Sequence, residues 1–180
     1  VHQDPLTGMS DLGFKATNVE QSRIYGGEIE VMMSRSFGEV MTTFTGGYTY
    51  IYPVEYNAYT SQNTGVFLKY RRKHTARASL AMTRHRIEAG LDLYARSKTL
   101  NIDDVFLNPA TREEILPGFY GYWQENNTGY FLMDCNIGCR LGDAMKVSLA
   151  VKNITNTEYM GRPGDIQPQR NFSIRLSGKF

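Results

Sequence analysis

The sequence predicts an all-β protein, a segment of an antiparallel transmembrane β-barrel that contributes about seven strands. Three observations predict this fold class: apolar and polar residues alternate along most of the chain, the alternating stretches are long, and short connections between them alternate with long ones. An alternation of period two is typical of strands with one dry and one solvated face. Outer-membrane barrels combine such strands with tight periplasmic turns and long outer loops.

The alternation is clearest in the last strand, which we expect at Arg170 to Phe180. Phe172, Ile174 and Leu176 alternate there with polar residues, and the strand ends on an aromatic side chain. The same pattern recurs at 87–96, 131–141 and 145–152. The polar positions include full charges, which fits a water-filled or plugged barrel lumen as well as an exposed sheet face.

The expected strands follow from the connections between the alternating stretches. Short turns are expected at 36–39, 84–86 and 142–143, and long irregular connections at 98–127 and 154–169. The strands, in order, are expected at Leu12–Arg35 with a bulge at Gly26 and Gly27, and at Val40–Tyr52, Gly65–Thr83, Ile87–Ser97, Thr128–Leu141, Ala144–Asn153 and Arg170–Phe180.

The number of strands bears on domain organisation. A chain that starts in an outer loop and ends at a periplasmic terminus crosses the membrane an odd number of times. Bacterial single-chain barrels close with an even number of strands, so about seven strands cannot make a whole barrel. We therefore expect residues 1–180 to form the carboxyl-terminal part of one barrel domain, with the missing strands upstream.

The overall composition excludes little by itself. The chain is 41% hydrophobic and 21% charged, with a formal net charge of +2, which is compatible with a soluble domain. Membrane barrels have similar averages because only alternate residues face lipid. No stretch approaches the roughly 18 apolar residues of a membrane-spanning helix, and the balanced charge gives no reason to expect nucleic acid as a partner.

Nothing in the sequence points to catalysis or to a bound cofactor. The motifs GxSxG, HExxH and CxxC do not occur, and the three histidines lack the spacing of metal ligands. Cys135 and Cys139 lie about 13 Å apart on one strand, too far for a mutual disulfide. A calcium site remains an alternative at four acidic residues without EF-hand-like spacing: Asp103, Asp104, Glu113 and Glu114.

The carboxyl-terminal residues follow a particular order. Asn153, Ile154, Thr155 and Asn156 follow the sixth expected strand, then come Tyr159, a loop with Gly161 and Gly164, and Arg170 before the strand that ends in Phe180. This order resembles the carboxyl-terminal signature of TonB-dependent outer-membrane receptors. Asn18, Gly26 or Gly27, and Glu28 resemble the family's Asn…Gly-x-Glu strand, and 69–80 resembles a segment that often carries Pro-Lys/Arg-His, with Arg72 in place of the proline.

The resemblance implies a barrel of about 22 strands around a plug domain, in the cell outer membrane of a Gram-negative bacterium. It implies a transporter and not an enzyme: a receptor that takes up a scarce large solute such as siderophore-bound iron, haem or cobalamin, with energy coupled through TonB. The plug would precede this chain and would contact the TonB complex. Other implied partners are a surface lipoprotein and the outer-membrane assembly machinery, which favours a terminal aromatic such as Phe180.

Two groups of side chains are candidates for function. Loop aromatics supply contact area at low entropic cost, so we expect ligand binding by Tyr56, Tyr59, Phe119, Tyr120, Tyr122 and Trp123. Lumen-side charges are expected to hold the plug through removable ion pairs: Glu28, Glu30, Arg77, Asp92, Arg96, Asp134, Arg140 and Arg175. Alternatively, the rings pack the loop, and the charges pair across the wall at about 0.2–1 kcal/mol each.

Further residues are expected at the lipid interface. Tyr48, Tyr50 and Tyr52 share a face with Val40 and Phe44, which predicts an aromatic girdle. The basic run of Lys69, Arg71, Arg72 and Lys73 is expected near the outer end of its strand. There it would contact phosphates of lipopolysaccharide, or form a solvated rim.

Two other classes of protein remain open. A passive porin or an adhesin-like barrel would have similar strands but no plug before them. A soluble secreted β-sandwich binding module also alternates along its strands, but its apolar face meets a second sheet rather than lipid.

Overall fold

A computed structural model describes residues 2–3, 10–11 and 21–178. The strands are β1 (His2–Gln3), β2 (Ser10–Asp11), β3 (Ser22–Phe37), β4 (Val40–Asn57), β5 (Gln62–Phe67), β6 (His74–Arg84), β7 (Ile87–Ser97), β8 (Gly129–Leu141), β9 (Met145–Lys152) and β10 (Asn171–Gly178). A 3₁₀ helix, η1 (Asp104–Phe106), and two short helices, α1 (Arg112–Ile115) and α2 (Phe119–Asn126), lie between β7 and β8.

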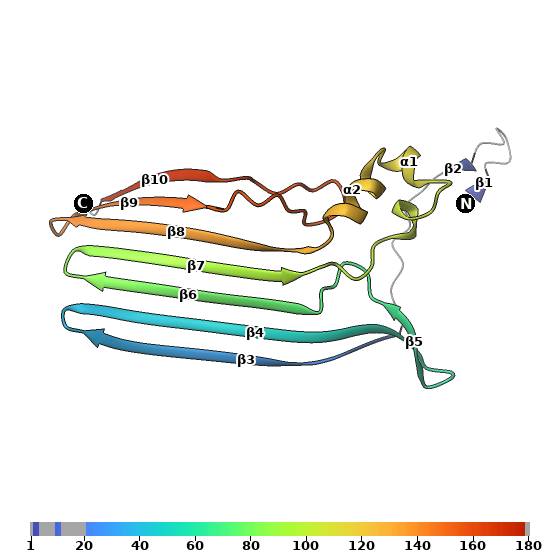
Figure 1. Ribbon diagram of the computed structural model, residues 1–180, viewed down its shortest axis with the longest axis horizontal. Helices are drawn as coiled ribbons and strands as arrows, with labels where there is room; N and C mark the ends of the chain where they lie inside the picture. Colours follow the sequence, from blue (N-terminus) through green and yellow to red (C-terminus); the bar gives the residue numbers. More distant parts are fainter. Residues whose placement is uncertain (1, 4–9, 12–20, 179–180) are drawn as a thin grey trace.

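The long strands form one antiparallel sheet in a single layer (Figure 1). Its order is β10-β9-β8-β7-β6-β4-β3, so that successive strands are neighbours, and β5 pairs with β4 beside this path. The short turns gather at one end of the sheet, together with the end of β10, and β5, the helices and the long connections gather at the other (Figure 1). We call these the turn end and the loop end. The predicted all-β class and the alternation of short and long connections are confirmed.

Four of the predicted strands agree closely with the structure. The strand predicted at Ile87–Ser97 is β7 itself, and β8, β9 and β10 begin one residue later than predicted. The turns predicted at 36–39, 84–86 and 142–143 are confirmed as short connections, formed by residues 38–39, 85–86 and 142–144, whereas Ser36, Phe37 and Arg84 still belong to strands. Parts of two predicted strands, Leu12–Arg35 and Arg170–Phe180, fall outside the described residues, and so does Phe180 itself.

The predicted bulge in the first strand is wrong. The register of β3 and β4 runs without a shift through Gly26 opposite Ile51 and Gly27 opposite Tyr50. Gly26 is required for another reason: a Cβ at this position would lie 1.9 Å from the backbone oxygen of Tyr50. The glycine therefore permits a close approach of two strands and does not mark an inserted residue.

The predicted third strand, Gly65–Thr83, is also wrong, because the chain breaks it into β5 and β6. Tyr70 has a φ of 60°, which interrupts a strand, and β5 turns aside to pair with the far end of β4. Consequently β4 continues past Pro53 to Asn57, and Tyr56 lies in this strand rather than in a loop. The connection predicted to be irregular at 98–127 contains η1, α1 and α2.

The register places one kind of side chain on each face of the sheet. Directly paired residues point to the same face, and Phe44, Leu80, Leu91, Cys135 and Val151 are linked in this way across five strands. We call this the apolar face and the opposite one the polar face. Both cysteines are free and share the apolar face, whose side chains are largely exposed, for example Ile174 at 76% and Phe172 at 70%.

The uncharged band of the apolar face, measured along the strands and corrected for their tilt, is about as tall as the apolar core of a bilayer. On the described strands, the Lys, Arg, Asp and Glu residues of this face lie only near its two ends: Arg35 and Arg84 at the turn end and Arg23 at the loop end. Arg23 and Arg35 are twelve residues apart on β3, about 40 Å along the strand at ~3.3 Å per residue. A tilt of about 45° reduces this to ~28 Å, close to the ~25 Å apolar band of outer-membrane barrels.

The buried core lies at the loop end and not within the sheet. Val54 is 0% exposed, Ile102 1%, Phe119 5% and Leu68 8%, and all four belong to β4 or to the connections at this end. A single-layer sheet has no second layer to cover either face, whereas the loop-end segments pack on one another. Within the described residues, no helix is long and apolar enough to cross a membrane.

Candidate functional site

A hollow of about 550 Å³ opens on the polar face at the loop end. Its floor consists of side chains at the ends of β7, β8, β9 and β10, and its rim consists of the connection between β9 and β10. The lining residues are Tyr94, Arg96, Tyr130, Leu132, Asp134, Lys152, Asn153, Tyr159, Gly161, Asp165, Gln167, Pro168 and Asn171. The hollow is large enough for part of a small-molecule solute.

The lining of the hollow combines rings with balanced charges. The rings of Tyr130 and Tyr159 lie with their centres 4.5 Å apart. Arg96 and Lys152 supply positive charge, and Asp134 and Asp165 supply negative charge. Burial, followed by the neighbouring Tyr130, raises the pKa of the Tyr159 phenol above its usual range, so this hydroxyl remains a neutral donor. Such a surface offers ring faces for stacking, and both donors and acceptors of hydrogen bonds.

Asn153 fastens the rim of the hollow to the sheet. This residue is 4% exposed and has a φ of 51°. Its Nδ2 donates to the backbone oxygens of Thr157 at 2.9 Å and Pro168 at 3.2 Å, and its Oδ1 accepts from the N–H of Thr157 at 2.9 Å. Its own N–H donates to Oδ1 of Asp134 at 2.7 Å. One asparagine therefore holds both ends of the connection and β8 together.

The second asparagine of the Asn-Ile-Thr-Asn element has a similar role at the start of β10. Asn156 has a φ of 52°, in the left-handed region that asparagine tolerates better than most residues. Its Oδ1 accepts the N–H of Arg170 at 3.0 Å. The element that resembles the family signature is thus a local clamp, which explains why asparagine stands at both of its ends.

The rest of the rim is a small hairpin. Met160 and Ile166 form an isolated bridge, and the N–H of Gly161 donates to the oxygen of Asp165 at 3.0 Å. The turn Arg162–Asp165 has proline in its second position and glycine in its third, as is typical of a type II turn. Gly164 has a φ of 79°, the positive value that this turn requires in its third position. The clamp and the hairpin together give the rim a defined shape.

The connection between β7 and β8 packs into a helical cap at the loop end. Phe119 packs edge-on against Phe106, with ring centres 5.5 Å apart, and tilted against Trp123 at 6.0 Å. The cap is joined to the rim of the hollow by the Tyr122 hydroxyl, which donates to Glu158 at 2.6 Å. This bond, followed by burial, raises the pKa of Tyr122 to about 12.

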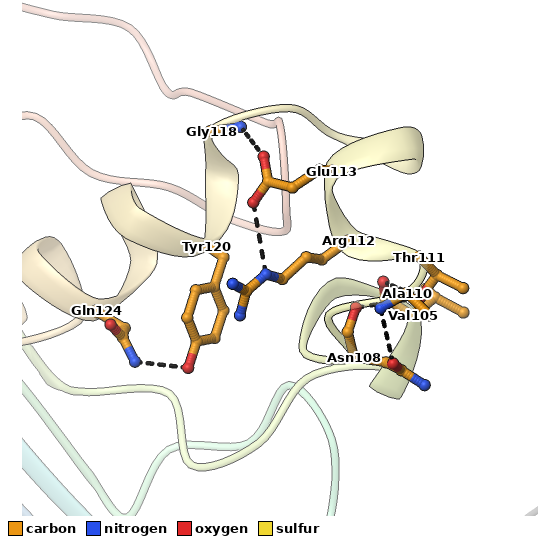
Figure 2. Close-up of polar contacts among 9 residues, drawn as sticks. All are labelled: Val105, Asn108, Ala110, Thr111, Arg112, Glu113, Gly118, Tyr120 and Gln124. Atoms are coloured by element: carbon orange, nitrogen blue, oxygen red, sulfur yellow. Dashed lines mark hydrogen bonds and ion pairs between the residues drawn. The ribbon is translucent and has the colours of Figure 1, made fainter.

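Polar contacts fix the helices of the cap to one another (Figure 2). The Arg112 guanidinium lies 3.9 Å from the centre of the Tyr120 ring, and its Nε is 3.5 Å from Oε1 of Glu113. The other oxygen of Glu113 accepts the N–H of Gly118 at 3.0 Å, and Gln124 donates to the Tyr120 hydroxyl at 2.6 Å. Because α1 and α2 are too short to be stable alone, these contacts and the aromatic core maintain them.

The predicted ligand-binding aromatics do not form one cluster. Phe119 is buried within the cap, and Tyr120 is covered by Arg112. Tyr122 and Trp123 line a small cavity of about 40 Å³ beside the hollow. The guanidinium of Arg23 lies 3.8 Å from the centre of the Tyr56 ring, and Tyr59 is 95% exposed in the turn between β4 and β5.

The eight predicted lumen-side charges all lie on the polar face, and several already have partners there. Arg77 and Glu30 form an ion pair across β4, where Gly47 stands opposite both. A Cβ at Gly47 would lie 3.0 Å from Nε of Arg77, so the glycine leaves room for the arginine to cross. Arg140 pairs with Glu88 at 2.6 Å.

Three other charges of this group make hydrogen bonds within the wall. Asp92 accepts from the hydroxyl of Ser79 at 2.6 Å, Glu28 accepts from Thr49 at 3.3 Å, and Arg96 contacts the Tyr130 hydroxyl at 3.4 Å. Arg175 lies on β10, opposite Ser148 of β9. Pairing across the wall is therefore extensive in the described strands.

The acidic residues considered for calcium do not come together. Asp103 accepts the hydroxyl of Tyr70 and pairs with Lys69 at 3.1 Å, and Glu113 is engaged within the cap. Burial, followed by the bond to Asp103, raises the pKa of Tyr70 to about 12. No cluster of three or more His, Cys, Asp or Glu residues suited to a metal ion occurs in the part of the chain that the structure describes.

Sequence reasoning missed the hollow, although two of its lining residues, Arg96 and Asp134, were predicted to face the lumen. Arg96 stands opposite Tyr130, and Lys152 opposite Asn171, all on the polar face at the loop end of adjacent strands. The alternation alone places these four on one face, and the turn order places them at one end. The contribution of Asp165 depends on the return of the β9–β10 connection over the sheet, which no local pattern predicts.

Comparison with known proteins agrees with this architecture. A family model described as TonB dependent receptor-like, beta-barrel matches residues 2–154. Among solved structures, the ferric-catecholate import receptor Fiu from Escherichia coli K12, in a closed form, matches with a TM-score of 0.60 and 19% sequence identity. The match covers 88% of the present chain and 21% of the Fiu chain. No curated protein matches the sequence.

Proposed function

Because this chain belongs to the TonB-dependent receptor β-barrel family, we propose that it is the carboxyl-terminal part of an outer-membrane barrel that imports a scarce large solute with energy coupled through TonB. The observation that carries this proposal is the match of the family's barrel model to residues 2–154. The plug domain, the earlier strands and the TonB contact belong to the remainder of the full-length receptor. The exposed apolar face and the polar face with its hollow support a wall between lipid and an aqueous lumen.

The solute is proposed to be an iron chelate, haem, cobalamin or a similar large molecule, and the hollow contributes to its binding surface. Arg96 and the Tyr130–Tyr159 pair are the proposed contacts inside the hollow. Four aromatics of the loop-end connections are proposed as outer contacts: the exposed Tyr59 and the half-buried Tyr120, Tyr122 and Trp123. Tyr56 is left out of this group, because it lies in β4 under the guanidinium of Arg23. Phe119 supports this group from inside the cap, where its ring is buried.

The lumen-side charges divide into two proposed roles. Arg77 with Glu30 holds β6 and β3 together across β4, and Arg140 with Glu88 holds the neighbouring strands β8 and β7 together. Arg96, Asp134 and Arg175 are proposed to contact the plug or the solute. Ion pairs and hydrogen bonds suit a plug that has to move, because water replaces them at a small net cost.

Uptake measurements on the full-length receptor test the proposed function. We expect cells in which it is the sole receptor to accumulate one of three labelled probes, a ferric catecholate, haem or cobalamin, and to do so only when TonB is present. Accumulation that is equal without TonB would identify a passive barrel instead. Absence of the full-length protein from the outer-membrane fraction would favour the soluble binding module.

The contribution of the hollow is tested separately. We expect Arg96→Gln and Tyr159→Ala each to weaken probe binding about tenfold, since a hydrogen bond to a charged group contributes about 1.5–3 kcal/mol and 1.4 kcal/mol is a factor of ten. The matched control is Thr43→Ala, which also lies on the polar face but near the turn end, where its hydroxyl contacts Ser34. Equal probe affinities for all three variants would show that the hollow is not part of the binding surface.

A further inference from the structure

The apolar face has a group of cations at its loop end. Lys73 lies between β5 and β6, and its backbone oxygen accepts the N–H of Ile51 at 2.9 Å. Its ammonium is 4.9 Å from the centre of the Tyr52 ring and 4.5 Å from that of Phe67. Since Tyr52 belongs to the apolar face, the charge of Lys73 is presented on that face, against aromatic rings.

A second cation lies across β4 from the first. Arg23 stands opposite Val54 in the register, and its guanidinium covers the Tyr56 ring at 3.8 Å. Stacked rings connect the two positions, because Tyr25 lies parallel to Tyr52 at 5.6 Å between ring centres. The two cations therefore flank one aromatic surface, where the charge-free band of the apolar face ends.

The neighbouring basic residues have different environments. Lys69 pairs with Asp103 at 3.1 Å. Arg72 donates to the backbone oxygen of Ser97 at 2.5 Å and covers the Tyr130 ring at 5.0 Å, on the side of the polar face. Two of the four residues in the basic run are thus engaged within the protein, and Lys73 is the one that lies over the rings of the apolar face.

Among the described residues, the cations over these rings have no acidic partner. Neither Lys73 nor Arg23 takes part in an ion pair among the residues that the structure describes. No Asp or Glu of the described strands stands on the apolar face. An anion from outside the protein would therefore balance these two positive charges. Because the cations border the apolar band, we expect this anion to be the charged group of a molecule that is otherwise apolar.

We propose that Lys73 and Arg23, with the rings of Tyr52, Tyr56 and Phe67, bind the phosphate groups of an anionic lipid in the outer leaflet. The cations contact phosphate oxygens, and the rings contact the adjoining upper part of the acyl chains, as aromatic residues do at membrane interfaces. Cation–π contact holds both charged groups in place before the lipid arrives. This proposal rests on the outer-membrane location that the proposed function includes.

Lipid binding to the purified full-length receptor tests this site. The receptor is placed in phosphatidylcholine nanodiscs, and its affinity is measured for lipopolysaccharide before and after enzymatic removal of the lipid phosphates. We expect the phosphorylated form to bind more tightly, and Lys73→Gln and Arg23→Gln each to lose about fivefold, the effect of ~1 kcal/mol per cation near an anionic surface. Lys73→Arg keeps the charge and is expected to keep the affinity.

The matched control is Arg35→Gln. Arg35 lies on the same strand and the same face as Arg23, and its guanidinium lies 5.6 Å from the Phe37 ring, but it stands at the turn end. We expect this variant to bind as the wild type does. An equal loss in Arg35→Gln, wild-type affinity in the Lys73→Gln/Arg23→Gln double variant, or full displacement by inorganic phosphate would overturn the proposal. The assay contains neither solute nor TonB, so its outcome is independent of uptake.

Discussion

Leu149→Arg in the full-length receptor is expected to destabilise the folded barrel by about 2–4 kcal/mol, the cost of a charge on the lipid face near the bilayer midplane. Leu149 is central on the apolar face: it stands in β9 between Ile137 of β8 and Ile174 of β10. Leu176→Arg, two register positions closer to the turn end, is expected to cost less, because the penalty falls toward the interface. The measurement is the yield of folded, membrane-inserted receptor and its resistance to denaturant.

Ala150→Arg is the matched control for this change. Ala150 is the next residue on β9, but it faces the polar side between Asn136 and Ser173. An arginine there enters an aqueous environment and is expected to leave the yield near that of the wild type. Wild-type yield for Leu149→Arg, or equal loss for both variants, would show that the apolar face does not meet lipid.

Asn153→Ala is expected to release the rim of the hollow. The change removes four hydrogen bonds of a buried amide side chain, a long one from the Thr155 hydroxyl at 3.4 Å and three shorter ones. The three shorter bonds contribute about 1 kcal/mol each. It also places alanine at a φ of 51°, which costs a further ~1 kcal/mol or more. A local loss of about 4 kcal/mol in total corresponds to a rise of roughly a thousandfold in opening. Hydrogen exchange of the backbone amides at 154–170 in the full-length receptor measures this opening.

Two further variants test whether faster exchange results from the lost hydrogen bonds of Asn153 rather than from any substitution near the rim. Asn153→Asp keeps the acceptor for Thr157 but loses both donated bonds, so we expect intermediate exchange rates. Asn171→Ala removes only an exposed contact with the oxygen of Gln169 at 3.1 Å and is expected to change little. Unchanged exchange in Asn153→Ala would mean that the rim is held by its hairpin alone.

The part of the fold that could be predicted is the part encoded locally. Period-two alternation together with turn residues placed β7 correctly, and placed the start of β8, β9 and β10 within one residue, because each strand carries its own pattern of faces. The side of the sheet on which the eight charged residues lie also followed from this pattern. Their ion pairs did not, since Arg77 reaches Glu30 only where Gly47 leaves space between them.

The errors arose where tertiary packing decides local structure. Nothing in the sequence indicates that Tyr70, which is not a glycine, has a φ of 60° and ends a strand pattern that continues on both sides of it. Nor does the stretch Phe119–Asn126 have the length or the caps of a stable helix. It is helical because Phe119 packs against Phe106 and Trp123. The hollow likewise depends on a connection that returns over the sheet.

Accessibility along β9 is the measurement that bears most directly on a wall between lipid and lumen. Single cysteines at Val147, Ser148, Leu149 and Ala150, in full-length receptor whose Cys135 and Cys139 are replaced by serine, are probed with a water-soluble thiol reagent and a lipid-soluble quencher. A barrel wall predicts strict alternation: Ser148 and Ala150 reached from water, Val147 and Leu149 reached from lipid. Protection of Val147 and Leu149 from both probes would place a second sheet over the apolar face and contradict the membrane barrel.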